Sequence, residues 1–392
     1  MKKAISVMLA LVLCIGALLI PAGAADVNGN GKLQFNKDGS FRILQISDIQ
    51  DGPALHPIVK DFIRDAVKEA DPDLVVLTGD NIGGPSCGIG VDAIDTPFVK
   101  IAIDKYMSIF EEAGVPVAMV FGNHDDQNIA VSKEEQMEMY QSYSCFIGND
   151  DNSELYGCGT YNLPIYSSDG SKIAYNLWMI DSNAFDKVNG GYDYVHQDQL
   201  DWYVKTSNDL KAQNGGNPVP SMMFQHIIVP EIYDALKEVP AGTEGSVERD
   251  GKYYVLNPEN TVSGELNEAP CPSKTNSGQF ETLIQQDDVV AMFFGHDHVN
   301  TFRVNYKGID LVNTPGVTFN SYGNDCRGAR IIDINENDTS YNTSIIFYKE
   351  LYKGDEAAEQ RFIAFGSENE FLDRVSAFFK YLFLKAVSII SL

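Results

Sequence analysis

The stretch Val289-Val290-Ala291-Met292-Phe293-Phe294-Gly295-His296-Asp297-His298 joins an apolar run to two histidines that stand one residue apart. The run before Gly295 has the length and composition of a buried strand. A strand that ends in this way can place two imidazole rings side by side at the edge of a sheet. On its own, the fragment fits two interpretations equally well: a reactive site, or a strand-to-turn corner whose histidines face solvent. The other apolar strands decide between them, because four of them also end on polar, reactive side chains.

The first third of the chain alternates strands with helices. Apolar strands and amphipathic helices are predicted in the order strand, helix, strand, helix, strand, at residues 41–47, 58–71, 74–78, 97–113 and 117–121. This order is typical of parallel βαβ units, whose reactive groups gather just beyond the carboxyl ends of the strands. The residues in that position are Asp48, Gln50, Asp80, Asn123 and His124.

Further strands follow in the second half of the chain. Residues 172–180 and 221–225 have strand character, and the second of these strands ends at His226. Short alternating strands between residues 301 and 348 predict antiparallel sheet. Residues 238–276 are rich in Gly, Glu, Asn and Pro without periodicity, and we interpret them as an insertion over the site.

The first 25 residues, 1–25, have the features of a secretory signal peptide. Lys2 and Lys3 form a charged start, an apolar stretch follows, and Ala22-Gly23-Ala24 is a small-residue cleavage motif. The alternative is an uncut membrane anchor, but the apolar stretch is shorter than the ~20 residues that a spanning helix needs. We therefore expect a secreted or cell-surface protein with one large domain over residues 38–350.

The charge and the cysteines limit the classes of function. A formal net charge of −26 argues against nucleic-acid binding by charge, because such a surface repels the phosphate backbone. An anionic substrate would need a local positive centre, and a pair of metal ions would supply one. None of the six cysteines has the spacing of a zinc-binding CxxC motif. Cys145 and Cys158 flank a polar loop and are the first candidates for a disulfide bond.

Residues 367–392 are predicted to form an amphipathic C-terminal helix, because apolar side chains recur there at helical spacing. Its cations are Arg374, Lys380 and Lys385. Two roles are open: docking on the body or on another subunit, or contact with a membrane surface. A membrane-spanning role is disfavoured, because Lys380 and Lys385 lie in the middle of the apolar stretch.

Five strand ends thus carry carboxylate, amide or imidazole groups that can bind metals. The candidate ligands are Asp48, Gln50, Asp80, Asn123, His226, His296 and His298. A mixed set of this kind suits Zn²⁺, Mn²⁺ or Fe better than Ca²⁺, which prefers oxygen ligands throughout. The set is too large for one ion but suits two divalent or trivalent ions, about 3.5–4 Å apart, that share a carboxylate. Such a pair holds a hydroxide nucleophile between its ions and clamps both oxygens of an in-line displacement at phosphorus.

The sequence resembles the calcineurin-like metallophosphoesterases in five blocks between about residues 41 and 335. The blocks are Asp48-x-Gln50, Gly79-Asp80-Asn81, Gly122-Asn123-His124-Asp125, His226 and Gly295-His296-x-His298. The residues around them resemble the branch named purple acid phosphatase 29-like in plants and its fungal counterparts. The resemblance implies a mixed α+β or α/β fold, a four-layer αββα sandwich with the two-metal site at one sheet edge.

The same resemblance assigns roles within the site. One metal ion would be held by Asp48, Gln50, Asp80 and His298. The other would be held by Asp80, Asn123, His226 and His296, so that Asp80 bridges the two ions. His124 would stabilise the transition state or protonate the leaving oxygen, and its alternative role is to orient Asp48 or the hydroxide. The implied reaction is hydrolysis of phosphomonoesters or phosphodiesters.

The sequence departs from the family pattern in two places. Most members have Asp-x-His in the first block, where Gln50 here offers an oxygen and no titratable nitrogen. We therefore expect the first metal ion to be held less firmly, or to be a harder ion. His56 could stand in, but the following Pro57 favours a helix start. Gly83 stands three residues after Asp80, where true purple acid phosphatases have a tyrosinate ligand.

Two hypotheses about function follow. The leading one is an exported phosphoesterase that depends on two metal ions. The alternative is a surface binding protein on the same fold that has lost catalysis, with Gln50 as the mark of that loss. Retention of the other ligands and of His124 favours the enzyme. Selectivity for the substrate is expected to lie in residues 126–172 and 238–276, and weaker candidates for substrate contact are Asn276, Tyr322 and Arg327.

Overall fold

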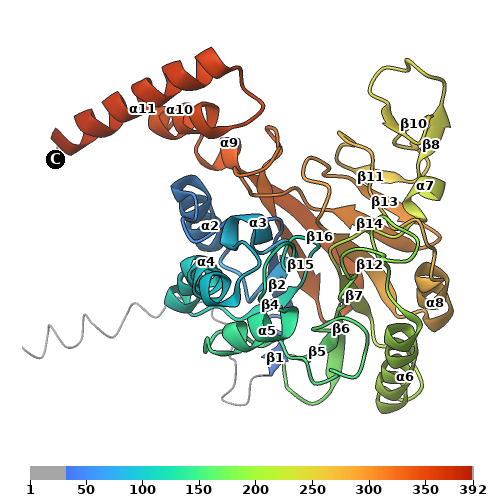
Figure 1. The fold of residues 1–392 in the computed structure, drawn as a ribbon. Coiled ribbons are helices and arrows are strands. Elements are labelled where there is room, and N and C mark those ends of the chain that lie inside the picture. The colour runs from blue at the N-terminus through green and yellow to red at the C-terminus, as the bar shows by residue number, and fades with distance from the viewer. Residues whose placement is uncertain (1–31, 391–392) are drawn as a thin grey trace, which may run out of the picture.

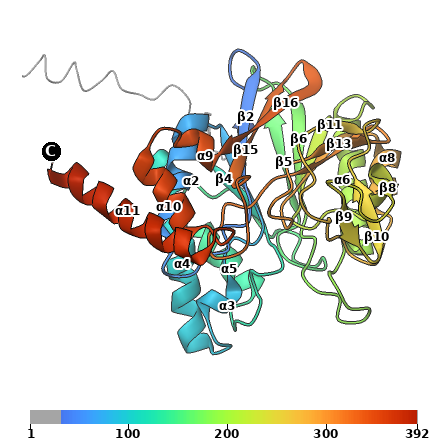
Figure 2. The same cartoon turned by 90° about the horizontal axis from the view of Figure 1, so that it is seen from above.

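Two large β-sheets lie face to face between two layers of helices in the computed structural model, which describes residues 32–390 (Figure 1). The predicted signal peptide, residues 1–25, lies outside the described residues. Seen from above, α2 and α4 cover one sheet, and α6 and α8 cover the other (Figure 2). These helices are α2 (Pro57–Ala70), α4 (Asp92–Ala113), α6 (Gln197–Gln213) and α8 (Gln279–Gln286).

The first sheet has five strands in the order β16-β15-β2-β3-β4. They are β2 (Ser40–Ile46), β3 (Leu74–Thr78), β4 (Val117–Val120), β15 (Gly328–Asn335) and β16 (Asp338–Phe347). The three N-terminal strands are parallel, as predicted, because α2 and α4 return the chain between them. The short helices α3 (Gly84–Cys87) and α5 (Lys133–Gln141) follow β3 and β4 along the chain.

The second sheet has eight strands in the order β1-β5-β6-β7-β12-β14-β13-β11. They are β1 (Leu33–Gln34), β5 (Tyr161–Tyr166), β6 (Ile173–Met179), β7 (Ser221–Phe224), β11 (Thr261–Ser263), β12 (Val289–Phe294), β13 (Arg303–Tyr306) and β14 (Ile309–Asn313). The antiparallel prediction for residues 301–348 holds for β13, β15 and β16 but is incomplete for β14. That strand also pairs in parallel with β12, while β15 returns to the first sheet and pairs with β2.

Three apolar clusters separate the four layers. Successive side chains of a strand point to opposite faces, so each strand serves two clusters. In β2, Leu44 and Ile46 face the helices α2 and α4, whereas Phe41 and Ile43 pack between the sheets. The third cluster lies between the second sheet and α6 and α8. Each fully buried aliphatic side chain in these clusters stabilises the fold by about 1.5–3 kcal/mol relative to an exposed one. The two sheets between two layers of helices confirm the predicted αββα sandwich.

The segment at residues 238–276 contains short strands that the sequence did not predict. β8 (Lys237–Val239), β9 (Val247–Arg249) and β10 (Lys252–Val255) form a small antiparallel sheet of their own after α7 (Ile232–Ala235). Strands this short show no detectable period in a sequence. The end of the segment reaches the carboxyl edge of β12, since the Cys271 N–H donates to Asp297 Oδ1 at 3.2 Å.

The predicted disulfide between Cys145 and Cys158 is wrong, because both thiols are free. The Cys145 carbonyl accepts a hydrogen bond from the Val117 N–H at the start of β4. The Cys158 N–H instead donates to the Asp181 carboxylate, just beyond the carboxyl end of β6. The two cysteines are therefore hydrogen-bonded through their backbones to different places, Cys145 at the start of β4 and Cys158 beyond the end of β6.

The C-terminal segment folds into α9 (Tyr348–Leu351), α10 (Glu356–Phe365) and α11 (Phe371–Ile390). α11 packs on α10 through the buried Ala377 and an edge-on contact between Phe365 and Phe378. The Arg374 guanidinium donates to the carbonyl of Ala364 at the end of α10. Among residues 32–390, no helix combines the length and the hydropathy that crossing a membrane requires.

Candidate metal centre

Strand ends from both sheets meet at one edge of the sandwich. β2, β3, β4, β7 and β12 each turn sharply after their last residue, and the turns hold the predicted ligands. Four of these ligands have positive φ angles: Asp48 (54°), Gln50 (47°), Asp80 (48°) and His296 (70°). A non-glycine residue in this region costs of order 1–3 kcal/mol, and such conformations gather at functional sites. The backbone strain therefore lies where the chemistry is predicted.

Asp80 lies at the centre of two ligand groups. Its carboxylate forms one group with His226 and His296 and another with Asp48 and His298, and the ligand atoms of each group lie within 4.8 Å of one another. His226 Nε2 is 3.3 Å from Asp80 Oδ2, and His298 Nε2 is 3.4 Å from Asp48 Oδ1. Asp80 is common to both groups, as expected for a carboxylate that bridges two ions.

Several buried ligand atoms have no hydrogen-bond partner within the described residues. They are Asp48 Oδ1, Gln50 Oε1, Asn123 Oδ1 and His226 Nε2. Buried polar atoms are bonded in about nine cases of ten, so a cluster of orphaned acceptors needs an explanation. All four atoms carry lone pairs that a cation can use, and Gln50 and Asn123 extend the two groups around Asp80. These residues fit a pair of metal ions.

Hydrogen bonds on the far side of the rings orient two of the candidate histidine ligands. His226 Nδ1 donates to the Thr78 carbonyl at 2.8 Å, and His298 Nδ1 donates to the Tyr322 carbonyl at 3.1 Å. A carbonyl only accepts, so one proton lies on Nδ1 of each ring, and Nε2 faces a carboxylate, where a metal cation could take the place of a second proton. The Tyr322 ring also stacks on His298, with the centroids 4.3 Å apart.

The electrostatics of the site favour positive charge at its centre. Burial opposes a charge on His226, but the Asp80 carboxylate outweighs burial and raises the pKa of His226 to about 10. Burial, with repulsion from His226, lowers the pKa of His296 to about 3. The pKa of Asp80 lies well below its ordinary value, because the attraction of His226 and His124 exceeds the cost of burial. The carboxylates remain ionised and attract cations.

Two glycines allow the strand ends to approach this closely. A Cβ on Gly122 would lie 2.2 Å from the Asp80 nitrogen, and a Cβ on Gly295 would lie 1.8 Å from Ser47 Oγ. Both distances are far below van der Waals contact, so any side chain there would push the ligand loops apart. The glycines that precede Asn123 and His296 are therefore part of the site.

His124 borders the ligand cluster without entering it. Its backbone N–H donates to Asp80 Oδ1 at 2.7 Å, and its Nε2 lies 4.0 Å from Asp80 Oδ2. The Gln127 amide oxygen lies 2.5 Å from His124 Nδ1 and accepts its proton, which leaves Nε2 to face the site. With a side chain 34% exposed, His124 can reach both substrate and solvent. This geometry suits a group that moves a proton.

The structure adds residues that the sequence analysis missed. Asp125 is fully buried and accepts hydrogen bonds from the N–H groups of Ile82 (2.9 Å) and Gly122 (2.6 Å), which ties two ligand loops together. Burial and the nearby Asp80 raise the pKa of Asp125 to about 7. Its place in the Gly-Asn-His-Asp block was a signal for it, whereas nothing in the sequence marked Gln127.

The structure also places the alternative ligand His56 and the three weaker candidates for substrate contact. His56 caps α2 through its side chain and does not join the ligand cluster, so the predicted helix start is confirmed. Tyr322 lines the cavity at the ligands, a space of about 100 Å³. Arg327 is buried and paired with Glu368, and Asn276 donates to Glu231, so neither of them lines that cavity.

Comparison with known proteins agrees with the family resemblance. The family model of the calcineurin-like phosphoesterases matches residues 41–300. The chain is 28% identical over 349 residues to "Probable inactive purple acid phosphatase 14" of Arabidopsis thaliana, with 80% of each chain covered. It is 27% identical over 342 residues to "Probable inactive purple acid phosphatase 29" of the same plant, with 79% of each covered. A solved structure of a dimetal phosphatase from Danio rerio aligns with 79% of this chain and 99% of its own, at 14% identity and a TM-score of 0.46.

Proposed function

The chain belongs to the calcineurin-like phosphoesterase family, and from this premise we propose that it is an exported enzyme that hydrolyses phosphate mono- or diesters. The observation that carries the proposal is the cluster of buried, orphaned ligand atoms around Asp80. Two metal ions bound there, Zn²⁺, Mn²⁺ or Fe, would supply Lewis acidity at phosphorus and lower the pKa of a water molecule. The signal-like sequence at residues 1–25 supports export.

The ligand roles proposed for the chain follow the two groups. Asp48, Gln50 and His298 would hold one ion, Asn123, His226 and His296 would hold the other, and Asp80 belongs to both groups. The role of Gln50 as a ligand is supported by its Oε1, which is buried without a hydrogen-bond partner among the described residues. Its Nε2 donates to Asp80 Oδ2 at 3.2 Å. An amide oxygen is a weaker and harder ligand than an imidazole, so the ion that Gln50 holds should exchange more readily.

His124 is proposed to protonate the leaving oxygen. Gln127 accepts the Nδ1 proton and so holds the ring with Nε2 towards the site. When His124 is protonated, Nε2 can donate to the ester oxygen as the bond to phosphorus breaks. His124 therefore marks the side of the site from which the leaving group departs.

A catalytically inactive binding protein is the alternative, and the names of the two plant relatives, which include "probable inactive", support it. Each unbonded buried acceptor costs about 1–3 kcal/mol when no ion binds, so these atoms argue for metal binding under either hypothesis. Five residues that match the family's ligands stand around Asp80, and His124 lies beside them. This retention favours the active enzyme.

Hydrolysis of simple esters tests the proposal. The purified chain is expected to cleave 4-nitrophenyl phosphate or bis(4-nitrophenyl) phosphate, to lose that activity on dialysis against a chelator, and to regain it with Mn²⁺ or Zn²⁺. The reason is that the chain's own side chains supply ligands and one proton donor but no nucleophile-generating cation. A folded chain that binds metal and cleaves neither ester would establish the binding protein instead.

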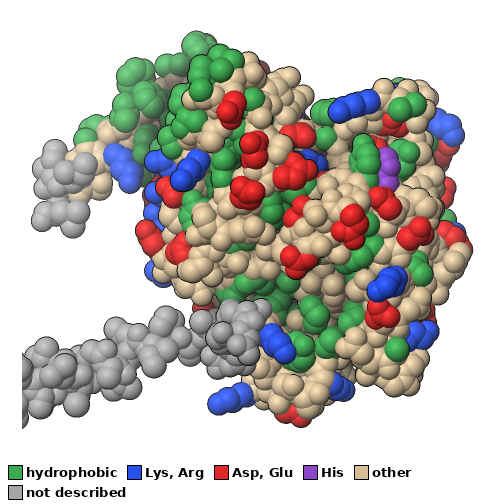
Figure 3. Space-filling model, turned by 60° about the horizontal axis from the view of Figure 1, so that its bottom comes forward, with side chains coloured by type: hydrophobic (Ala, Val, Ile, Leu, Met, Phe, Trp, Pro, Cys, Tyr) green, Lys and Arg blue, Asp and Glu red, His purple; other side chains and the backbone are tan. Residues whose placement is uncertain are grey.

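The C-terminal helix α11 leaves most of its apolar side chains uncovered, and we propose that this face contacts a membrane surface. Hydrophobic side chains gather over this end of the molecule at the upper left of Figure 3. The exposed apolar residues of α11 are Phe371, Leu372, Val375, Phe378, Phe379, Leu382, Phe383 and Val387. Lys385 can reach headgroups from the same helix, and so can Lys380 when its exposed ion pair with Glu356 opens.

Truncation after Glu370 should abolish binding to anionic lipid vesicles without changing the hydrolysis of soluble esters. This end point keeps Glu368, whose carboxylate pairs with the buried Arg327 at 2.8 Å. Co-sedimentation with vesicles, alongside a hydrolysis assay, measures both effects. If the intact protein does not bind vesicles and the truncated protein changes its oligomeric state, α11 is a protein-binding helix and the membrane proposal fails.

A further inference from the structure

A second and larger cavity lies beside the metal centre. It has a volume of about 570 Å³ and is formed by the loop after His124, the start of α5, and the loop after β6. Two contacts join it to the metal centre. Gln127 lines the cavity and bonds to His124, and Phe185 lines it and stacks on Tyr192, whose ring lies 4.3 Å from that of His296. The two cavities therefore share a wall.

The larger cavity lies on the side of the leaving group. Asp126 stands two residues after His124, so their Cα atoms are at most about 7 Å apart. Because His124 protonates the leaving oxygen in the proposed reaction, the rest of the leaving group must extend past His124. The space that it meets there is this cavity. A cavity of this size accommodates a small organic molecule.

The lining mixes hydrogen-bond acceptors and donors in nearly balanced charge. Carboxylates come from Asp126, Glu134 and Asp193, and ammonium groups from Lys133 and Lys187. Lys133 is already neutralised, since its ammonium bonds to the buried Asp181 carboxylate at 2.9 Å. The lining therefore has no excess positive charge to bind a second phosphate. An apolar ligand would leave the polar groups of the lining without hydrogen-bond partners.

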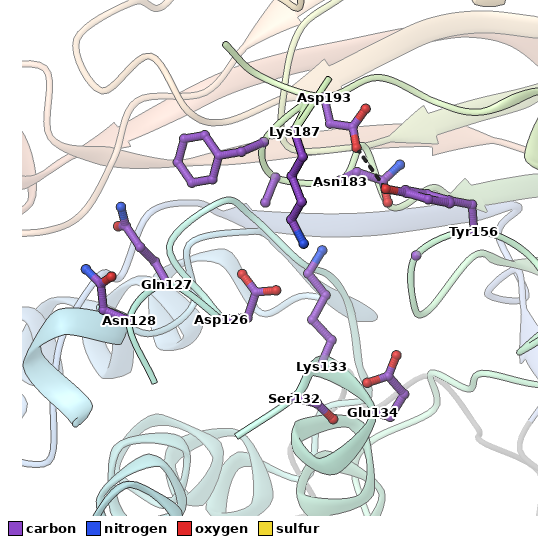
Figure 4. Close-up of a pocket in the computed structure, with 13 residues that line it drawn as sticks. Asp126, Gln127, Asn128, Ser132, Lys133, Glu134, Tyr156, Asn183, Lys187 and Asp193 are labelled. Carbon is purple, nitrogen blue, oxygen red and sulfur yellow. Dashed lines mark hydrogen bonds between the residues drawn. The ribbon is translucent and has the colours of Figure 1, made fainter. Parts of the chain in front are cut away.

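Several of these polar groups are available to a ligand. Within residues 32–390, side chains of the lining that make no hydrogen bond or ion pair are those of Asp126, Asn128, Glu134 and Lys187. In Figure 4, the ammonium groups of Lys133 and Lys187 point into the same part of the cavity as the Asp126 carboxylate. Tyr156 is 48% exposed and adds an aromatic ring, one face of which stacks on His196. A ring that bears hydroxyl groups can satisfy all of them, because each hydroxyl both donates and accepts.

We infer that this cavity binds the leaving group of the substrate and that the substrate is a phosphate ester of a polyhydroxylated, sugar-like alcohol. The inference rests on the proposed function. In the reaction, the bond between phosphorus and the sugar oxygen breaks, water supplies the new oxygen on phosphorus, and His124 gives its proton to the sugar oxygen. The products are the free polyol and inorganic phosphate.

The test compares two esters of primary alcohols, glucose 6-phosphate and hexyl phosphate, with the metal-loaded full chain. Wild-type kcat/KM should be at least tenfold higher for glucose 6-phosphate, since several hydrogen bonds distinguish the two leaving groups. Asp126→Ala and Lys187→Ala should each reduce this ratio by about threefold to tenfold. Lys211→Ala is the matched control and should leave the ratio unchanged, because Lys211 lies about 20 Å along α6 from the end next to the cavity.

Three outcomes contradict the inference in distinguishable ways. Equal kcat/KM for the two esters would refute the sugar-binding cavity and leave phosphate ester hydrolysis intact. A preference for fructose 1,6-bisphosphate over both esters that Lys187→Ala removes would show that the cavity holds a second phosphate. Hydrolysis of none of the three would also refute the inference, and it would refute the proposed function only if 4-nitrophenyl phosphate and bis(4-nitrophenyl) phosphate are not cleaved either.

Discussion

Asp80→Asn is expected to reduce kcat/KM for phosphate esters by at least ~10³-fold. The substitution keeps the size of the side chain but removes the negative charge shared by both ligand groups. Metal ions supply several kcal/mol of charge stabilisation in such transition states, and each 1.36 kcal/mol changes the rate tenfold. Bound metal, measured by elemental analysis of the same sample, should fall together with activity.

Asp288→Asn is the matched control for this experiment. Asp288 is also buried, accepts hydrogen bonds from Tyr203 and Ser207, and precedes β12 at the end opposite the site. Its replacement should lower the free energy of unfolding by about 1–3 kcal/mol and leave kcat/KM and metal content unchanged. Wild-type rates in folded Asp80→Asn would show that the reaction does not depend on this carboxylate.

His124→Ala is expected to lower kcat by ~10²–10⁴-fold while both metal ions stay bound. The side chain is close to the ligands, but its Nε2 is 4.0 Å from Asp80 Oδ2 and its Nδ1 is engaged by Gln127. A proton donor matters most for a poor leaving group, so hexyl phosphate should lose more activity than 4-nitrophenyl phosphate. Steady-state kinetics on both esters separate proton donation from mere positioning, which would slow both equally.

His56→Ala serves as the control for the histidine experiment. His56 caps α2, with its ring nitrogen 3.4 Å from the Ile58 N–H, so its loss should cost a little stability and no metal. Loss of metal from His124→Ala would identify His124 as a ligand and contradict its role as the proton donor to the leaving oxygen. Loss of metal from His56→Ala would mean that this residue, and not Gln50, completes the first metal site.

The sequence was enough to predict the strands that carry the ligands. Those strands are short and mostly apolar, β3 and β7 are buried along their whole length, and a ligand follows within a few residues of each strand end, as Asp80 follows β3 and His226 follows β7. The polar residues at these ends have no packing role that competes with the functional interpretation. Pattern and chemistry therefore pointed to the same positions.

The cavity proposed to bind the leaving group could not be predicted, because its walls come from loops that are distant in the sequence. Residues 126–134 and 183–193 carry no motif, and only the fold brings them together. The expected selectivity region at residues 126–172 does contribute Asp126, Lys133 and Tyr156, but the loop after β6 was not anticipated. The free thiols of Cys145 and Cys158 show the same limit, since closeness along the chain did not imply a disulfide bond.

Anomalous diffraction from crystals of the metal-loaded protein is the most direct test of the two-metal centre. The structure predicts two anomalous peaks, both within bonding distance of the Asp80 carboxylate, one beside Asp48 and His298 and the other beside His226 and His296. The absence of any peak at Asp80 in crystals grown with Mn²⁺ or Zn²⁺ would contradict the two-metal centre and the hydrolysis that depends on it.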